Sequence, residues 1–534
     1  MGIYLNPRND GFKEAIRSEI YVDKTGLIAL VNITVNTMRK LTCISRPRRF
    51  GKSYAAKMLC AYYDLSCDSH GLFDDKEIAK TEGYLKHMNQ YHVISLDITG
   101  FISEAKRQRK SMADVPGNIV NAVHKELKEL YPQLTFGENL MEDMIRCADE
   151  TGREFVFIID EWDALIREAK GDVEIQSAYF NLLRGWFKNS NFTPRAVAAA
   201  YMTGILPIKK DGSQSAISDF REYTILNPGR FVEFTGFTEN EVRSLCGKYG
   251  MDFNEIQQWY DGYDFPGCGS IYNPYSVMYA MQEQKCRSYW QKTSAAESLM
   301  TYINMDFEGL QETIARLISN EEIEVRTDRF ANDFETFKSR DDVLTLLIHL
   351  GYLTWNEEDG TAHVPNEEVQ AEFEQILAGT GANRKWMDLL NRSEKLLKDT
   401  IAGNAKAVAK AIQAVRETQY APTFYNDEQA LRYVIKFAYI AALDQYLKVE
   451  ELPSGRGIAD VIYLPKRRSA LPALVVELKW NKTSESAIRQ IKERNYPAVL
   501  EDYYGEIVLV GINYDAVKKE HSCMIEKASA ELFS

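Results

Sequence analysis

The feature that most constrains this chain is a β-prone run that leads through a basic loop into a helix. Residues 41–45 are β-prone, residues 46–53 read Arg-Pro-Arg-Arg-Phe-Gly-Lys-Ser, and residues 52–63 have a helical pattern. Free amides at a helix start and the positive end of the helix dipole bind anions. The succession of strand, loop and helix therefore predicts a phosphate-binding loop in an α/β domain.

Three residues of the loop have the chemistry that a nucleotide requires. Gly51 lets the backbone approach a phosphate, Lys52 is expected to reach the β- and γ-phosphates, and Ser53 is expected to ligate Mg²⁺. The G-x-x-x-x-G-K-[ST] pattern has a glycine where this chain has an arginine, so Gly-Lys-Ser alone is a weak signal. Three neighbouring arginines are candidate phosphate clamps, namely Arg46, Arg48 and Arg49.

An apolar run that ends in two carboxylates strengthens the nucleotide hypothesis. Residues 155–159 are apolar and precede Asp160 and Glu161. Continuous hydrophobicity is typical of a strand buried on both faces of a parallel sheet, and such sheets bind ligands at their carboxyl ends. We expect Asp160 to hold Mg²⁺ and Glu161 to polarise an attacking water. The alternative is a buried strand with a solvated acidic end.

The strand predicted at 196–203 ends in Thr203, a candidate sensor of the γ-phosphate. A strand-end hydroxyl with no such role explains Thr203 equally well. The alternation of β-rich and helical segments, including a strand at 92–97 and a helix at 176–187, predicts an α/β domain with a largely parallel sheet.

We expect the chain to have three parts. Residues 1–284 would form a P-loop ATPase domain, residues 285–390 a helical connector, and residues 391–534 a further α/β domain. A helix at 341–350 followed by a hairpin at 352–364 makes the connector winged-helix-like.

The C-terminal part contains two β-prone runs, residues 455–464 and 473–479, joined by a turn. A hairpin symmetric about 468/469 places Asp460 opposite Glu477, and such close like charges are unfavourable unless a cation binds them. Mg²⁺ takes one or two protein carboxylates together with phosphate oxygens. Lys479 leaves the same face as Glu477 and is expected to orient the attacking water. The pattern predicts metal-assisted phosphodiester hydrolysis.

The alternative is a surface hairpin in which Lys479 merely pairs with Glu477 or Asp460. Gln490, on a predicted helix at 486–495, could also face the site. Weaker candidates for a further carboxylate are Glu428, Glu450 and Glu451. The basic turn residues Lys466, Arg467 and Arg468 form a candidate patch for a phosphate backbone.

Motifs in order along the chain carry a resemblance to a known family. They lie at 21–25, 46–53, 202–205, 234–238, 262–265, 272–274, 351–354, 364–369, 455–457 with Asp460, 477–479 and 488–491. They resemble the bacterial AAA-ATPase-like family whose members carry a C-terminal PD-(D/E)XK nuclease domain. In that family the phosphate loop itself has the Arg-Pro-Arg-Arg-Phe-Gly-Lys-Ser form. The resemblance implies an AAA-like ATPase domain at the N-terminus and a restriction-endonuclease-like α/β domain at the C-terminus.

The resemblance also implies roles for particular residues. The nucleotide and its Mg²⁺ would be bound by Lys52, Ser53, Asp160 and Glu161. The nuclease metal would be held by Asp460 and Glu477, with Lys479 as the catalytic lysine and Gln490 as the glutamine that often follows in this fold. The implied cofactors are ATP and Mg²⁺, with Mn²⁺ possible at the nuclease site. The implied partner is nucleic acid, DNA in preference to RNA, and a homo-oligomer is possible.

The leading hypothesis is an ATP-regulated, metal-dependent nuclease that acts on DNA. One alternative is a nucleotide-dependent switch whose nuclease-like domain only binds nucleic acid or a protein partner. A second alternative is an ATP-driven protein remodeller.

Charge and cysteine usage indicate which part of the chain suits an anionic ligand and which cellular compartment suits the protein. The formal net charge is −13, and residues 391–534 hold 21 Lys/Arg against 19 Asp/Glu, which leaves 43 against 58 for residues 1–390. A polyanion ligand is therefore more plausible in the C-terminal part. Eight scattered cysteines favour a reducing cytosol. With no apolar run of about 18 residues and no signal-peptide pattern, we expect a cytoplasmic protein without a membrane span.

Overall fold

The computed structural model describes most of the chain. The described residues are 2–169, 172–208, 217–265, 268–290, 310–318, 321–328, 330, 339–379, 384–419, 431, 435, 438–439, 442, 446–449, 461–465, 471–493 and 505–529. The chain divides into two compact units, Met1–Leu310 with Glu322–Glu372 and Gln311–Glu321 with Phe373–Ser534. The division of the chain into three domains, with boundaries at 284/285 and 390/391, stays a prediction. Among the described residues, no helix is long and apolar enough to cross a membrane.

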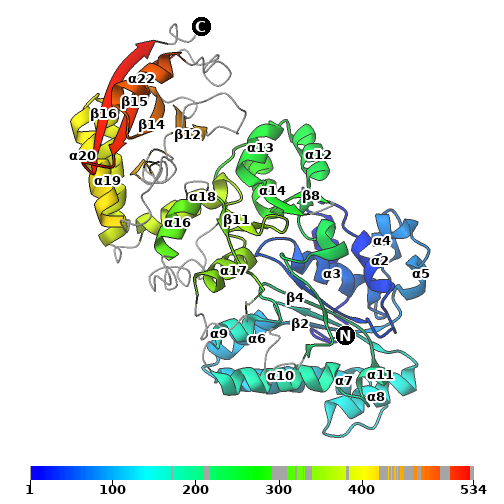
Figure 1. Cartoon of the computed structure of the whole chain (residues 1–534). Helices are drawn as coiled ribbons and strands as arrows, with labels where there is room; N and C mark the ends of the chain where they lie inside the picture. The colour runs from blue at the N-terminus through cyan, green and yellow to red at the C-terminus, as the bar shows by residue number, and fades with distance from the viewer. Residues whose placement is uncertain are drawn as a thin grey trace. The chain divides into compact units, whose positions relative to one another are not determined.

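A five-stranded sheet forms the centre of the first unit (Figure 1). Its strands are β1 (Leu41–Ser45), β2 (His92–Asp97), β3 (Phe155–Asp160), β4 (Val197–Gly204) and β5 (Arg221–Tyr223). The order is β2-β3-β4-β1-β5, and every neighbouring pair is parallel. The predicted α/β fold with a parallel sheet is confirmed for this unit, and only β4 differs from its predicted range, by one residue at each end.

Both faces of this sheet are buried, as the apolar run at 155–159 predicts. Phe155, Phe157 and Ile159 pack into one core, whereas Val156 and Ile158 pack into the other. The first core includes α6 (Ile98–Arg107), η2 (Met112–Asp114), α7 (Val115–Leu130), α8 (Leu140–Thr151), α9 (Ala164–Glu168), α10 (Val173–Phe187) and α11 (Thr193–Ala196). The second includes α1 (Asp10–Ile16), α2 (Gly26–Asn32), α3 (Lys52–Tyr63), α4 (His70–Phe73), η1 (Glu77–Lys80), α5 (Tyr84–His87) and η4 (Gly229–Phe234). Figure 1 shows these two sets on opposite sides of the strands.

The strand order decides where the site forms. Because β4 lies between β1 and β3, the carboxyl ends of these three strands meet at one edge of the sheet. The segments that follow β1 and β3 and the end of β4 therefore lie close together, although they are far apart in the sequence.

Two small sheets complete the first unit. Antiparallel strands β6 (Phe237–Thr238), β8 (Gly269–Tyr272) and β7 (Tyr263–Phe265) pack with α12 (Glu239–Tyr249), α13 (Phe253–Tyr260) and α14 (Pro274–Glu283). The second sheet has β10 (Thr354–Asn356), β11 (Thr361–His363) and β9 (Ile323–Glu324), and it follows α17 (Arg340–Leu350). The predicted helix and hairpin are both present. Gly351 ends α17 with φ 85°, and a Cβ there would lie 2.7 Å from Pro47 of the phosphate loop, so only glycine fits.

The second unit is built on a mixed five-stranded sheet of order β12-β13-β14-β15-β16. Its strands are β12 (Tyr446–Val449), β13 (Val461–Pro465), β14 (Ala473–Trp480), β15 (Glu506–Asp515) and β16 (Glu520–Ser529). Only the β14–β15 pair is parallel. The remaining helices among the described residues are α16 (Leu310–Ile318), α18 (Glu367–Gly379), α19 (Arg384–Ile401), α20 (Ala405–Gln419) and α22 (Ser484–Glu493).

The hairpin of β13 and β14 has the register that the sequence predicts. Val461 pairs with Val476, and Tyr463 pairs with Leu474, which makes the hairpin symmetric about 468/469. Asp460 itself lies outside the described residues. Helix α22 packs across β14 and β15, and a Cβ on Gly511 would lie 2.5 Å from the carbonyl oxygen of Ser484. This close approach fixes α22 against β15, the parallel neighbour of the strand that carries the predicted site.

Candidate functional site

A cavity of about 630 Å³ opens beside the phosphate loop in the first unit. Residues 48–53 of the loop line it together with Glu161 and Arg167. Its apolar lining comes from Phe12, Ala15, Ile20, Val22, Met58, Phe234, Phe237 and Met278. A cavity that combines charged and apolar walls in this way has the chemistry to hold both the phosphates and the base of a nucleotide.

The phosphate loop has the conformation of an anion site. Arg49 and Gly51 have φ of 70° and 81°, in the left-handed region, and α3 begins directly afterwards at Lys52. Gly51 caps α3 without a side-chain hydrogen bond, and the first amides of a helix have no partner within the helix. These amides are therefore available to a phosphate at the point where the helix dipole is positive.

Lys52 is buried and lies at the inner end of the loop. Its ammonium group donates to the carbonyl oxygens of Arg46 at 3.1 Å and Pro47 at 2.9 Å, and it lies 3.9 Å from Oε1 of Glu161. Burial lowers the pKa of Lys52, and the nearby Glu161 opposes this shift. Phosphate oxygens are stronger acceptors for an ammonium group than the two carbonyls that hold it here.

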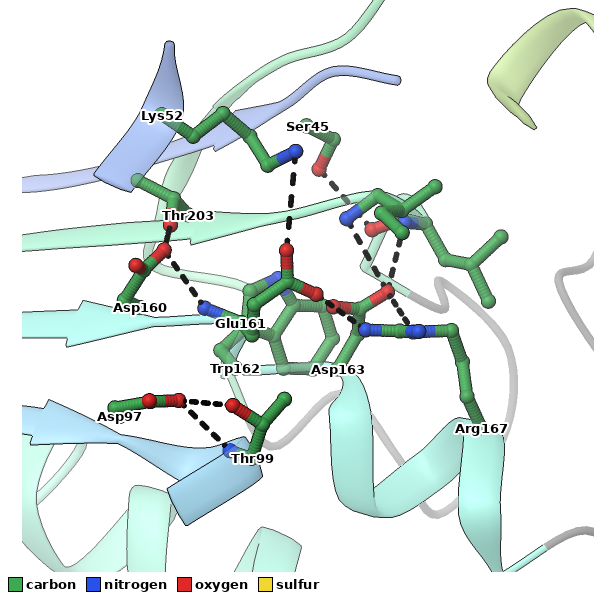
Figure 2. A network of polar contacts seen from close by, with 12 residues as sticks. Ser45, Lys52, Asp97, Thr99, Asp160, Glu161, Trp162, Asp163, Arg167 and Thr203 are labelled. Atoms are coloured by element: carbon green, nitrogen blue, oxygen red, sulfur yellow. Dashed lines mark hydrogen bonds and ion pairs between the residues drawn. The ribbon is translucent and has the colours of Figure 1, made fainter. Parts of the chain in front are cut away.

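Asp160 and Thr203 meet where β3 and β4 end (Figure 2). The Thr203 hydroxyl donates to Oδ1 of Asp160, and the same oxygen accepts from the backbone amide of Glu161 at 3.1 Å. Thr203 is fully buried. In this arrangement the hydroxyl orients the Asp160 carboxylate. The sequence allowed two roles for Thr203, a strand-end hydroxyl or a sensor of the γ-phosphate, and this contact corresponds to the first.

Glu161 projects from the turn after β3 with φ 51°, a conformation that few residues other than glycine adopt. Its carboxylate faces Lys52 on one side and accepts a hydrogen bond from Nη2 of Arg167 on the other. Burial raises the pKa of Glu161, whereas Lys52 lowers it. The structure thus brings Lys52, Asp160 and Glu161 together, as the topology predicts.

Two further residues of this network were missed by the sequence interpretation. Asp163 accepts hydrogen bonds from Nε of Arg167 at 3.0 Å and from the amides of Ile205 at 3.2 Å and Leu206 at 2.9 Å. It therefore ties the segment after β4 to the turn after β3 (Figure 2). The helical spacing of Asp163 and Arg167, four residues apart, is the signal that could have identified the pair.

The structure does not bring Arg46 to the cavity, and this corrects the phosphate clamp predicted there. Arg46 is 1% exposed and donates to Oγ1 of Thr235 at 3.0 Å and to the carbonyl oxygens of Ser45 at 3.1 Å and Tyr223 at 3.2 Å. Burial lowers its pKa to about 10. The residue that replaces the usual glycine thus turns its side chain into the protein and joins the loop to the segments around it.

Arg48 and Arg49 do line the cavity. The Arg49 guanidinium lies 3.8 Å from the ring centre of Tyr275 and donates to the carbonyl oxygen of Tyr289 at 3.4 Å. Ser53 also lines the cavity, in the first turn of α3. Arg48, Arg49 and Ser53 are thus placed where a phosphate or its cation can be reached.

In the second unit, the structure brings Glu477, Lys479 and Gln490 together. Glu477 and Lys479 lie on β14 and are 1% and 4% exposed, with 2.7 Å between Nζ of Lys479 and Oε1 of Glu477. The same Oε1 accepts from Nε2 of Gln490, which lies on α22. The ammonium group also donates to the carbonyl oxygen of Leu478 at 2.9 Å.

Several candidates for the second site lie outside the described residues. They are Glu428, Glu450, Glu451, Asp460, Lys466, Arg467 and Arg468. Within the described part of the chain, no group of three or more His, Cys, Asp or Glu residues is arranged to hold a metal ion. The described residues of this site therefore comprise one carboxylate, one ammonium group and one amide.

Comparison with known proteins bears on the first unit. Residues 10–213 match the family model described as AAA-ATPase-like, predicted AAA-ATPase. The first unit contains an AAA-ATPase-like P-loop domain. The match ends at residue 213, so the PD-(D/E)XK assignment of the C-terminal part stays a prediction.

A relative from Azotobacter chroococcum mcd 1, described as an uncharacterized protein in the vnfD 5′ region, is 26% identical over 371 residues. The alignment covers 67% of this chain, which spans 66% of the length of that relative. The crystal structure of Cdc6p from Pyrobaculum aerophilum matches at 9% identity over 69% of this chain and 96% of that chain. Its TM-score is 0.25, too low to support an argument about fold or function.

Proposed function

We propose that this protein binds and hydrolyses ATP in its first unit and cleaves nucleic acid, DNA in preference to RNA, in its second. The observation that supports the ATPase part is the cavity in which Lys52 and Glu161 face each other 3.9 Å apart, beside the start of α3. The proposal includes a cytoplasmic location and allows a homo-oligomer. All eight cysteines are free thiols, as a reducing compartment requires.

The residues beside the loop suit a magnesium nucleotide. The Ser53 hydroxyl and the Asp160 carboxylate are hard oxygen donors of the kind that Mg²⁺ prefers, and Mg²⁺ usually keeps few protein ligands when it binds with phosphates. Bound there, Mg²⁺ would neutralise part of the phosphate charge. Thr203 holds Asp160 in position, and Lys52 and Arg48 supply positive charge for the phosphates.

Glu161 is the residue that we assign to the attacking water. Its carboxylate lies between two cations, Lys52 and Arg167. A triphosphate would draw both cations toward its own oxygens, because charge-assisted bonds to phosphate are strong. Glu161 would then accept a proton from water while Lys52 and Arg167 face the transferring phosphoryl group.

A Glu161→Gln variant tests this assignment. The amide keeps the size of the side chain and removes the base, so ATP affinity should be kept while steady-state hydrolysis falls by about a hundredfold or more. Titration calorimetry and phosphate release measure the two quantities separately. Hydrolysis at the wild-type rate would exclude Glu161 as the base.

The nuclease proposal depends on Glu477, Lys479 and Gln490, with Asp460 added from the sequence. A carboxylate that is 1% exposed, beside a lysine on the same strand face, can hold Mg²⁺ or Mn²⁺ and orient water against a phosphodiester. The test is a cleavage assay with plasmid, linear DNA, single-stranded DNA and RNA, with and without ATP and Mn²⁺. We expect cleavage of DNA that EDTA abolishes.

A second candidate function is a nucleotide-dependent switch whose second unit only binds nucleic acid or a protein partner. The observation that favours it is the direct 2.7 Å contact of Lys479 with Glu477, which neutralises the carboxylate without a metal. ATP binding without cleavage of any substrate in the assay above would favour this candidate and would contradict the nuclease.

A further inference from the structure

A second cavity, of about 400 Å³, lies at the β5 edge of the sheet in the first unit. Thr42 and Arg221 line it and are register partners of β1 and β5. Thr42 is the second residue of β1, whereas the phosphate loop follows the end of that strand. The two cavities share no lining residue, so this one is separate from the proposed nucleotide site.

Three arginines from three different segments line this cavity. Arg39 precedes β1, Arg221 lies on β5, and Arg230 lies in η4. All three are exposed, and no Asp or Glu lines the cavity with them. Within the part of the chain that the structure describes, none of the three side chains is in an ion pair.

Three other exposed arginines of the same unit are in ion pairs. Arg107 pairs with Glu104, Arg195 with Asp149 and Arg243 with Glu239, each at 2.6 Å. Residues 1–390 carry more acidic than basic side chains, 58 against 43, yet no Asp or Glu lines this cavity. Three guanidinium groups gathered without a carboxylate repel one another, and an anionic ligand would remove that repulsion.

We propose that this arginine cavity, defined by Arg39, Arg221 and Arg230, binds the phosphates of a nucleic-acid strand. Guanidinium groups match phosphate geometry with paired hydrogen bonds. The cavity is also lined by Ile33 and Met38, which are 66% and 99% exposed. Apolar side chains that protrude beside arginines can contact bases while the arginines hold the backbone.

This inference does not depend on the nuclease proposal, because it concerns binding in the other unit. It also places a polyanion contact within residues 1–390, whose net negative charge does not predict one. The net charge of a region averages over its surface, whereas these three arginines act together at one cavity.

The test uses the full chain in EDTA and a fluorescent single-stranded oligonucleotide, followed by anisotropy. Replacing Arg39, Arg221 and Arg230 together by alanine should raise Kd about tenfold or more and should lower the slope of log Kd against log salt by about 2. The matched control replaces Arg107, Arg195 and Arg243 by alanine. It makes the same change in net charge, and it should bind the oligonucleotide like the wild type.

A second variant distinguishes a loss of binding from a loss of folding. Replacing the same three arginines by lysine keeps the charge, so the salt slope should stay while affinity falls severalfold through loss of paired hydrogen bonds. Unchanged affinity in the alanine variant, or an equal loss in the control, would overturn the proposal. Displacement of the oligonucleotide from the wild type by polyglutamate but not by tripolyphosphate would overturn it as well, because the site would then prefer carboxylates to phosphates. If the alanine variant lost tripolyphosphate binding but still bound the oligonucleotide, the cavity would bind free phosphates and the assignment to a nucleic-acid strand would be overturned.

Discussion

Both units contain a buried lysine beside a glutamate, but the two pairs are built differently. Lys52 and Glu161 come from separate elements, the start of α3 and the turn after β3, and their charged atoms are 3.9 Å apart at a cavity. Lys479 and Glu477 lie two residues apart on one strand and are in direct contact at 2.7 Å. The first pair is a loose ion pair at a cavity wall, whereas the second is a direct hydrogen-bonded contact.

This difference determines which further groups each proposed site needs in order to bind its ligand. In the first unit, under the proposed function, phosphates would replace the weak carbonyl partners of Lys52, and the described residues would bind the nucleotide. In the second, Glu477 is already neutralised by Lys479, so a metal has to compete with that ammonium group. A further carboxylate would favour the metal, and the sequence offers Asp460 for that purpose.

The largest expected effect concerns the pair of Lys479 and Glu477. Lys479→Ala should reduce DNA cleavage about a hundredfold or more while leaving ATP affinity unchanged, because under the proposed function the lysine orients water in the second unit only. Gel-based cleavage rates and calorimetry measure the two effects. Lys482→Ala, an exposed lysine just beyond the same strand, is the control and should cleave normally. Equal cleavage by the Lys479 variant would show that this pair is only structural.

The buried carboxylate of Glu368 shows what burial does when backbone amides replace the ammonium group. Glu368 accepts hydrogen bonds from the amides of Tyr289 at 2.7 Å and Trp290 at 3.1 Å, and burial raises its pKa to about 7 from 4.5. Because the pKa is higher in the folded state, ionisation of Glu368 reduces stability as pH rises from about 4.5 to 7.

Glu368→Gln should remove this dependence. Relative to the wild type, the variant should gain about 3 kcal/mol in the free energy of unfolding between pH 4 and pH 8. Glutamine can still accept from both amides, so packing is kept. Chemical denaturation at several pH values measures the difference. A constant difference across this range would contradict the raised pKa of Glu368.

The smallest expected effect concerns Arg167, which contacts the pair of Lys52 and Glu161 through Glu161. If ATP draws Arg167 toward its γ-phosphate, Arg167→Ala should weaken ATP binding about fivefold more than ADP binding, a difference of about 1 kcal/mol. Calorimetry with each nucleotide gives the ratio. Arg195→Ala, an exposed arginine paired with Asp149, is the control. Equal losses for ATP and ADP would place Arg167 away from the γ-phosphate.

The sequence predicted the central fold well because its signals are local. β3 is a continuous apolar run and β1, β2 and β4 are β-prone, whereas the short polar strand β5 was not predicted. The rule that parallel strands end at one edge brought Lys52, Asp160 and Glu161 together. The hairpin register of β13 and β14 followed in the same way from the symmetry of a single turn.

Long-range contacts explain what the sequence did not predict. The side-chain partners of Arg46 lie at Tyr223 and Thr235, far along the chain, so a charged loop residue gave no sign that it would be buried. Arg167, by contrast, was missed although its contacts with Asp163 and Glu161 are local, four and six residues apart, and the contact with Glu161 depends on the turn after β3. The arginine cavity joins three segments that no local pattern connects.

Calorimetric titration of the full chain with Mg-ATP shows whether Lys52 makes the first unit a nucleotide site. We expect saturable binding by the wild type and by Lys57→Ala, an exposed lysine on the same helix. Lys52→Ala should lower the affinity about a hundredfold, since it removes the buried cation that faces the phosphates. Wild-type affinity in the Lys52 variant would contradict the account.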